Sequence, residues 1–238
     1  VADVRALRGR PALYVANHQT AIETLMFSLL GGAISGVPMV TLAKAEHRES
    51  WYGELLAWLF AHPDVTEPEL TRYFDRGDPA ALPALLESVP PDRSIFLHGE
   101  GTRATSAGQP LGPMSGVPLD LAIARGLPVV PVRFTGGLPR EGERKRDFPV
   151  GMARQDVFLG APIEAATLAA LPYKERVSRV SAAIAALGPR EDAPNAPQPE
   201  LPDAAPRAVL ASLVDPASIP DDPWGRRLRA LLTGAGDD

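Results

Sequence analysis

The chain has 238 residues, of which 45% are hydrophobic, so it is long enough for one domain of ordinary size with an additional segment. The formal net charge of −5 does not favour nucleic acid, and the absence of cysteine excludes disulfides, thiol nucleophiles and thiolate metal ligands. No apolar stretch reaches the roughly eighteen residues that a membrane-spanning helix needs.

Short apolar runs alternate with helical patterns along residues 1–188. In chain order these predict a strand at 12–16, a helix at 20–30 ended by Gly31 and Gly32, a strand at 38–42, a helix at 49–60, a helix from 78 to 89, a strand at 94–98, a helix at 118–125, strands at 127–134 and 157–159, and a helix at 172–187. Two prolines in 127–134 indicate an edge strand or a bulge. Strands alternating with helices predict an α/β fold, a layered domain with a largely parallel central sheet flanked by helices.

The composition changes at Gly188. Residues 189–223 hold nine prolines and seven acids, and few large apolar side chains. Such a segment cannot bury enough surface to offset its ordering entropy. We therefore expect residues 1–188 to form the folded domain and 189–238 to be a linker or tail rich in proline, alanine and acids, with one short helix at 224–232.

A histidine and an acid with four residues between them follow the first predicted strand. His18 lies at the carboxyl end of that strand, where ligands of α/β sheets bind, and a neutral imidazole there can accept a proton from an attacking alcohol. The carboxylate of Glu23 can accept the other ring N–H, which fixes the tautomer and stabilises the imidazolium. Glu23 also completes a capping box with Thr20, and the sequence leaves the two roles open.

A second polar turn, Glu100-Gly101-Thr102-Arg103, follows the strand predicted at 94–98. Gly101 gives the backbone the freedom to turn the acid and the arginine toward one point, and the planar Arg103 guanidinium suits phosphate oxygens. Glu100 then holds Arg103 or another cation in place. An ordinary turn with a surface ion pair is the alternative. With His18, the turn offers a base for a hydroxyl and a cation for a phosphate, as acyl transfer to a phosphorylated alcohol requires.

Together these motifs resemble those of the glycerolipid acyltransferase family, which includes 1-acylglycerol-3-phosphate and glycerol-3-phosphate acyltransferases. The resemblance covers residues 10–165, and the motifs that carry it are Asn17 to Glu23, Tyr73 to Pro79 with Arg76, Phe96 to Arg103, and Val129 to Val132. Four motifs in the family's order make a chance similarity implausible. Lys44 also matches a lysine that commonly follows the second strand.

The resemblance implies a mechanism in which the histidine deprotonates the acceptor hydroxyl. The hydroxyl attacks an acyl thioester of coenzyme A or acyl carrier protein, and no metal or further cofactor is needed. The implied roles are catalysis for His18 and Glu23, binding of the acceptor phosphate for Lys44, Arg76, Glu100, Gly101, Thr102 and Arg103, and the acyl-side pocket for Pro131. The expected acceptor is lysophosphatidate, which gives phosphatidate. Glycerol 3-phosphate or another polar-lipid alcohol, a catalytically silent acyl- or lipid-binding module, and a hydrolase are the alternatives.

Four positions, in three places, depart from the family's pattern. The acid of the first motif is usually aspartate and here is Glu23, which leaves the geometry of the dyad open. The third motif usually has phenylalanine and proline where this chain has His98 and Gly99. Ser115 stands where the family often has lysine. These departures indicate either a subfamily with a different acceptor or weakened activity.

Several other features have two interpretations. His98 is either structural or a group that takes part in the chemistry, whereas His47 and His62 are expected to be solvated. The basic segment 140–146 is a solvated loop or a contact for anionic lipid or an acidic carrier protein. The apolar run 25–30 either belongs to the core or lines an acyl tunnel.

The chain starts at Val1 and ends in a segment rich in proline and alanine, which suggests a piece excised from a larger synthase. The resemblance extends to the acyltransferase domain that ends some multidomain polyunsaturated fatty acid synthases, where a carrier protein would supply the acyl group. We expect a cytoplasmic domain that reaches its lipid at the membrane surface, as a peripheral protein, or through a partner.

Overall fold

The computed structural model describes residues 4–60 and 70–196, and four residues of the C-terminal segment, Ile219, Asp221, Arg226 and Arg229. The strands are β1 (Leu13–Ala16), β2 (Met39–Lys44), β3 (Thr71–Phe74), β4 (Ser94–His98), β5 (Val129–Thr135) and β6 (Asp156–Leu159). The α-helices are α1 (Ile22–Ser35), α2 (Trp51–Phe60), α3 (Ala81–Ser88), α4 (Val117–Ala124), α5 (Ala165–Ala169) and α6 (Tyr173–Ala185). Short 3-10 helices are η1 (Val4–Leu7), η2 (Ala45–Glu49) and η3 (Val150–Met152). Within the described ranges, none of the helices combines the length and the hydropathy of a membrane span.

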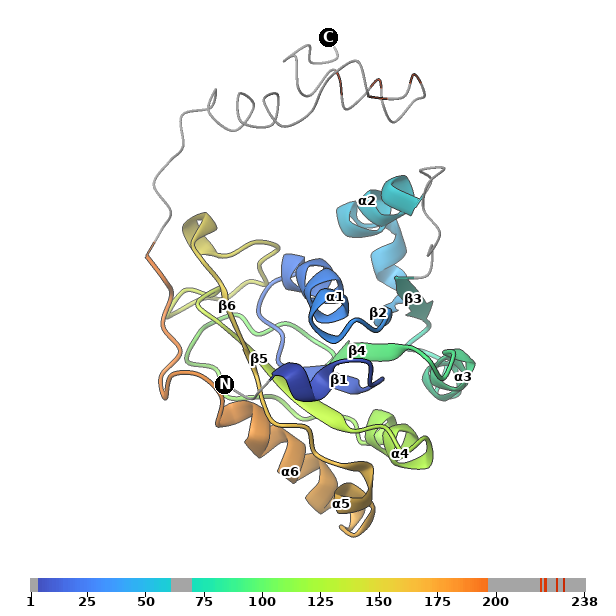
Figure 1. The fold of residues 1–238 in the computed structure, drawn as a ribbon. Helices are drawn as coiled ribbons and strands as arrows, with labels where there is room; N and C mark the ends of the chain where they lie inside the picture. Colours follow the sequence, from blue (N-terminus) through green and yellow to red (C-terminus); the bar gives the residue numbers. More distant parts are fainter. Residues whose placement is uncertain are drawn as a thin grey trace.

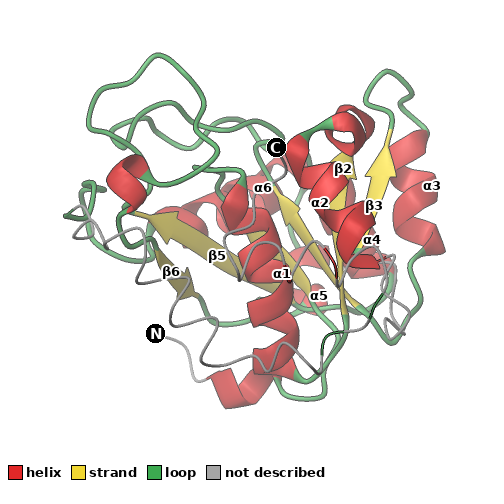
Figure 2. Cartoon of the chain, turned by 90° about the horizontal axis from the view of Figure 1, so that it is seen from above, coloured by secondary structure: helices red, strands yellow, loops and turns green. Residues whose placement is uncertain are grey.

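The six strands form one sheet in the order β3-β2-β4-β1-β5-β6 (Figures 1 and 2). Strands β1 to β5 are parallel, and β6 is antiparallel to β5. Helices α1 and α2 cover one face of the sheet, and α3 to α6 cover the other (Figure 1). These features confirm the predicted α/β fold with a largely parallel sheet flanked by helices.

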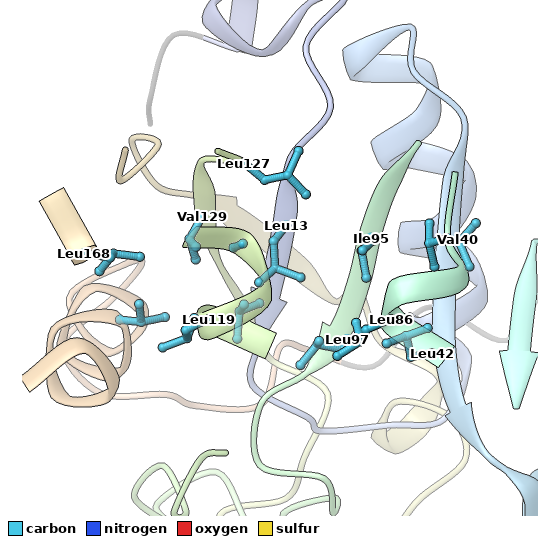
Figure 3. Close-up of a cluster of buried hydrophobic side chains, with 14 of the residues drawn as sticks. Leu13, Val40, Leu42, Leu86, Ile95, Leu97, Leu119, Leu127, Val129 and Leu168 are labelled. Carbon is cyan, nitrogen blue, oxygen red and sulfur yellow. The ribbon is translucent and has the colours of Figure 1, made fainter. Parts of the chain in front are cut away.

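The core consists of two layers because successive side chains of a strand point to opposite faces of the sheet. On the side of α3 to α6, the buried cluster includes Leu13, Val40, Leu42, Leu86, Ile95, Leu97, Leu119, Leu127, Val129 and Leu168 (Figure 3). On the α1 side, Tyr14, Phe96 and Phe134 pack against Phe27 of α1. This alternation also decides toward which face of the sheet the side chain of each residue at a strand end points.

The topology also fixes the place of a ligand site. Strands β1 and β4 are neighbours, but the helix that follows β1 lies on one face and the helix that follows β4 lies on the other (Figure 1). Parallel sheets bind ligands at the carboxyl edge where the connections diverge in this way. The segment after β1 begins with Asn17-His18, and the segment after β4 contains Gly99 to Arg103.

Helix α1 continues five residues beyond its predicted end at Leu30, through Gly31 and Gly32 to Ser35. The two glycines do not end the helix. A Cβ at Gly31 would lie 2.4 Å from the terminal methyl group of Met39 on β2, so this flexible side chain would have to move to admit it. The helix ends instead at Gly36, which has φ +67° and the left-handed conformation of a C-cap.

The structure also shows two short elements that the sequence pattern does not predict, β3 and α5. Strand β3 pairs with β2 at the edge of the sheet, and its residues are half-buried. It brings the second motif to the carboxyl edge, beside the end of β2. Helix α5 lies against α4 and contributes Leu168 to the core.

Strand β5 lies between β1 and β6, so the predicted edge position is wrong. The alternative prediction, a bulge, matches the register. Val132 pairs with Leu159, but Val129 pairs with Ile163, so the segment beside β5 holds one extra residue next to Pro131. The proline, which has no N–H to donate, lies beside this interruption.

The first residues of the predicted tail contact the folded domain. Asp192 accepts a hydrogen bond from the backbone N–H of Gly136 at 2.9 Å, and its other oxygen contacts the amide nitrogen of Gln19. Most of the helix predicted at 224–232 lies outside the described residues, although Arg226 and Arg229 are helical.

Candidate active site

A cavity of about 360 Å³ lies at the carboxyl ends of β2 and β4. Its polar lining residues are His18, Thr24, Lys44, His47, Ser50, His98, Arg103, Ser115 and Asp147. Its apolar lining residues include Leu42, Phe74, Leu82, Leu97 and Pro118. The cavity therefore combines ionisable groups with an apolar wall, as ligand sites commonly do.

His18 and Glu23 form the predicted dyad. The Nδ1 atom of His18 lies 2.8 Å from Oε1 of Glu23, so the ring N–H donates to the carboxylate. The other ring nitrogen, Nε2, has no hydrogen-bond partner within the described ranges, and the ring lines the cavity. The longer side chain of glutamate thus reaches the histidine, and the sequence departure at this position preserves the contact.

The same carboxylate holds the start of α1. Oε1 of Glu23 accepts the backbone N–H of Gln19 at 2.7 Å, and Oε2 accepts the side-chain amide of Gln155 at 2.8 Å. The Thr20 hydroxyl lies 3.5 Å from Oε2. The N-cap of α1 is Ala21, which has no side-chain capping hydrogen bond, so the predicted capping box with Thr20 does not form in its regular geometry. The buried carboxylate instead binds the backbone before the helix while it orients His18.

Burial controls the protonation of the dyad. Desolvation raises the pKa of Glu23 to about 7, although hydrogen bonds and the charge of His98 oppose this change. Desolvation also lowers the pKa of His18 well below its ordinary value, and the charges of Arg103, His47, Lys44 and Lys145 act in the same direction. The neutral imidazole, which can accept a proton, is favoured at neutral pH.

His98 lies directly beside the dyad. Its ring stacks on that of His18 with centroids 3.6 Å apart and planes 12° from parallel. Its Nδ1 lies 2.7 Å from the carbonyl oxygen of Asn17, and its Nε2 lies 2.9 Å from the hydroxyl of Thr24. One ring nitrogen of His18, one ring nitrogen of His98 and one carboxylate oxygen of Glu23 all lie within 4.8 Å of one another. The spacing of these residues in the sequence does not reveal that they are close. The hydrogen bonds to Glu23, Asn17 and Thr24 account for this arrangement.

The predicted phosphate-binding cations divide into two groups. Lys44 and Arg103 line the cavity. Arg76 is exposed and does not line it, although the charge of Arg76 contributes to lowering the pKa of Lys44, after desolvation. Arg103 is already paired, because its Nη1 donates to Oδ1 of Asp147 at 2.6 Å and to the carbonyl of Arg146 at 2.5 Å. The sequence gives no sign of this aspartate.

The turn after β4 places its residues in different surroundings. Gly101 lines the cavity with φ +60°, the left-handed conformation expected of it, whereas Thr102 is exposed and does not line the cavity. Glu100 forms neither a hydrogen bond nor an ion pair with Arg103. Its two oxygens accept the backbone N–H groups of His18 at 3.0 Å and Gly112 at 2.7 Å. Glu100 therefore connects the two segments that carry the site.

The residues at two further departures from the family's pattern, Gly99 and Ser115, both line the cavity. Gly99 packs under the side chains of Met114 and Val15, which occupy the space that a Cβ would need. Ser115 lines the cavity, and its hydroxyl accepts the N–H of Val117 at 3.3 Å. In these positions the chain has neither the proline nor the lysine of the family's pattern.

Three further expectations have different outcomes. Pro131 is buried in β5 and lines neither this cavity nor a second, 900 Å³ cavity between residues 104–114 and α6, and its role at an acyl-side pocket stays a prediction. Of the run 25–30, Leu25 and Phe27 are buried in the core, as one of the two interpretations expects, whereas Met26, Leu29 and Leu30 are exposed. His47, expected to be solvated, is half-buried and lines the active-site cavity. His62 lies outside the described residues.

Sequence reasoning missed the residues that hold the dyad from a distance. Gln155, just before β6, donates to Glu23 from 132 positions away, and Thr24 holds His98 across 74 positions. No local pattern marks either residue. Thr24 does follow Glu23 directly, and His98 ends a predicted strand, so the shared position at the carboxyl edge is the signal that could have found their contact.

Comparisons with known proteins address the chain as a whole. A search of curated proteins finds no match. Among solved structures, the 1-acyl-sn-glycerophosphate (LPA) acyltransferase PlsC from Thermotoga maritima is similar, with 18% identity, a TM-score of 0.47, and coverage of 76% of this chain and 69% of that chain. The family model described as Acyltransferase matches residues 2–135, a stretch that contains every predicted site residue. Because this match includes more than half of the sequence, the chain belongs to the acyltransferase family.

Proposed function

We propose that the chain transfers a fatty acyl group from a thioester, carried by acyl carrier protein or coenzyme A, to the hydroxyl of lysophosphatidate, giving phosphatidate. The observation that carries the proposal is the His18–Glu23 dyad at the cavity. One ring nitrogen donates to a buried carboxylate, and the other is available to a ligand in the cavity. This is the arrangement that a general base requires.

The reaction follows from that geometry. As the acceptor oxygen attacks the thioester carbonyl, its proton passes to Nε2 of His18, and Glu23 stabilises the imidazolium through Nδ1. The new C–O bond forms, the C–S bond breaks, and the proton passes from His18 to the leaving thiolate. The histidine ends the cycle neutral, so the step needs no covalent enzyme intermediate.

The charged and apolar parts of the cavity suit the two substrates. Lys44 and Arg103 lie on the same cavity as His18 and would bind the phosphate of the acceptor, while Arg76 supports the positive potential from outside. The apolar wall, which includes Leu42, would contact hydrocarbon. Binding both substrates beside the base supplies the proximity that the transfer needs.

A carrier-protein donor has support from the loop that contains the basic segment 140–146. The backbone carbonyl of Arg146 accepts the N–H of Ala21 at 3.3 Å, which places this loop beside the start of α1. The charge of Lys145 contributes to lowering the pKa of both His18 and Lys44. We propose that the basic side chains contact the acidic surface of a carrier protein.

A donor and acceptor panel tests the function. Purified protein is incubated with acyl-CoA or acyl carrier protein and with lysophosphatidate, glycerol 3-phosphate or a non-phosphorylated alcohol, and the products are identified by mass spectrometry. We expect phosphatidate to form, and His18→Ala to lower the rate by about a hundredfold or more.

Each other outcome selects a different function. Free fatty acid without a new ester identifies a hydrolase, and ester formation on glycerol 3-phosphate alone identifies the other acceptor. Thioester binding with no turnover identifies a binding module. A non-phosphorylated alcohol that reacts while both phosphorylated acceptors stay inert contradicts the assigned role of Arg103.

A further inference from the structure

We propose that His98 is a positioning residue for the acyl transfer proposed above: its neutral ring is an aromatic platform that orients His18 and stabilises the imidazolium formed when the hydroxyl proton arrives. The inference rests on the proposed function for its catalytic consequence. The platform itself is a property of the folded chain and can be measured without substrate.

The stack is close and restrained. The rings of His18 and His98 lie 3.6 Å apart between centroids, nearly parallel at 12°. Behind His98, Phe96 approaches edge-on at 5.0 Å and Phe134 lies at 6.1 Å. The His98 side chain is 7% exposed. His98 therefore has little room to move, and it limits the rotation of the His18 ring that rests on it.

The hydrogen bonds fix the tautomer of His98. The carbonyl of Asn17 can only accept, so Nδ1 of His98 carries the proton that it donates at 2.7 Å. Nε2 then accepts the hydroxyl proton of Thr24 at 2.9 Å. The Asn17 side chain is itself held by two hydrogen bonds to the backbone of Phe134, at 2.9 and 2.7 Å. Both ring nitrogens are thus occupied, so His98 cannot serve as a second base.

The electrostatic surroundings make an uncharged platform useful. Desolvation, followed by the charge of His18, lowers the pKa of His98 to about 3, so this ring stays neutral while His18 is protonated. The charged and titratable groups around His18 are Glu23 from α1, His98 from β4, Lys44 from β2, His47 from η2, Lys145 from the basic loop, and Arg103 and Glu100 from the turn after β4, of which Glu100 accepts the backbone N–H of His18. Four of these carry or can carry positive charge and oppose protonation of His18. The Glu23 carboxylate and the electron-rich face of the His98 ring favour it.

Two substitutions at this position separate the ring from its hydrogen bonds. His98→Phe and His98→Leu both remove the contacts to Asn17 and Thr24, but Phe keeps an aromatic face against His18 and Leu does not. The variants are therefore matched in the hydrogen bonds that they lose, and they differ in whether an aromatic face lies against His18. The readout is the titration of the His18 ring, followed by NMR in protein labelled at histidine, together with the pH profile of kcat/KM.

We expect His98→Phe to keep the wild-type titration midpoint of His18, and to keep kcat/KM within a few-fold, although its thermal midpoint falls. We expect His98→Leu to lower the midpoint by up to about one pH unit, to move the acidic limb of the kcat/KM profile in the same direction, and to lower its plateau up to about tenfold. A role confined to packing would lower stability without moving the limb. If His98→Leu does not fold, His98→Met provides the non-aromatic comparison.

Equal His18 midpoints in the wild type, the Phe variant and the non-aromatic variant overturn the platform. Failure of the proposed function has a different signature, because the wild type then forms no ester with any donor. A lowered midpoint in the non-aromatic variant alone would still support the platform in that case. The titration of His18 therefore tests the platform, and ester formation by the wild type tests the proposed function.

Discussion

The two sides of the active-site cavity are built in different ways. On the base side, Glu23 is buried, the His98 side chain is 7% exposed, and every polar side-chain atom of both residues has a hydrogen-bond partner. On the cation side, Lys44 is the last residue of β2, and Arg103 and Arg76 lie in loops with more access to solvent. The base side is therefore suited to orienting a reacting group, and the cation side is suited to binding a charged ligand.

This difference predicts how strongly a substitution on each side of the cavity should affect the protein. A buried hydrogen-bonded group has one arrangement, and removing a partner leaves another polar atom without compensation. A partly exposed cation keeps water as an alternative partner, so its loss is smaller. Variants of the base side should therefore lower kcat, whereas variants of the cation side should raise KM for the acceptor.

The largest effect is expected for Glu23→Gln. The amide of glutamine can donate to Nδ1 of His18, which moves the ring proton to Nε2 and removes the base. We expect kcat to fall by about a hundredfold or more with little change in KM. Steady-state kinetics with lysophosphatidate measure it. Glu23→Asp, which has the family's usual acid, is the comparison and should be affected less; equal kcat for Gln and wild type would show that the carboxylate has no role.

The pH dependence of the base side comes next. Burial raises the pKa of Glu23 to about 7, so the His18–Glu23 pair takes up one proton as the pH falls through that value. Whether the proton resides on the carboxylate or on the ring, Nε2 of His18 then carries a hydrogen. We expect kcat/KM to fall about tenfold per pH unit below 7 and to level off above it. A profile that is flat between pH 5 and 8 would contradict the dyad.

Arg103→Met tests the cation side, and Arg176→Met is its matched control. Each arginine binds an aspartate and one backbone carbonyl, and their side chains are 18% and 23% exposed, but Arg176 does not line the cavity. We expect Arg103→Met to raise KM for lysophosphatidate by about tenfold with kcat nearly unchanged. The control should keep the wild-type KM. Equal effects of both substitutions would show a general loss of charge.

The smallest effect is expected for Asp147→Asn. The substitution releases the Arg103 guanidinium from its ion pair, so more of its positive charge reaches a bound phosphate. We expect KM to fall by about two- to fivefold, and the effect to shrink at high salt because exposed ion pairs are screened. A rise in KM would mean that Asp147 orients Arg103 and does not compete for it.

The sequence predicts most of what lies at the carboxyl edge of the sheet, for a physical reason. His18 and Arg103 both follow apolar runs that form parallel strands, and parallel strands deliver such residues to one edge whatever the intervening chain does. The same rule brings the residues after β2 there. Strand β3 escapes detection because its four residues are half-buried and lack the continuous apolar pattern of the central strands.

What could not be predicted depends on side-chain direction or on distant partners. Glu100 and Arg103 belong to one turn, yet the acid binds backbone N–H groups and the arginine binds Asp147, 44 positions later. Spacing in a turn does not fix which way each side chain points. Similarly, the pattern of an apolar helix does not tell that Leu25 faces the core while Met26 faces outward.

The side-chain amide that donates to the Glu23 carboxylate comes from outside the segment that the family model matches. The family model ends at residue 135, whereas Gln155 stands at the entry to the antiparallel strand. A recombinant fragment trimmed to the matched stretch would keep every motif residue but would lose this hydrogen bond. It would also lack β6, one of the two strands that pair with β5. Expression boundaries, and any transplant of this catalytic unit into another scaffold, should therefore extend past β6.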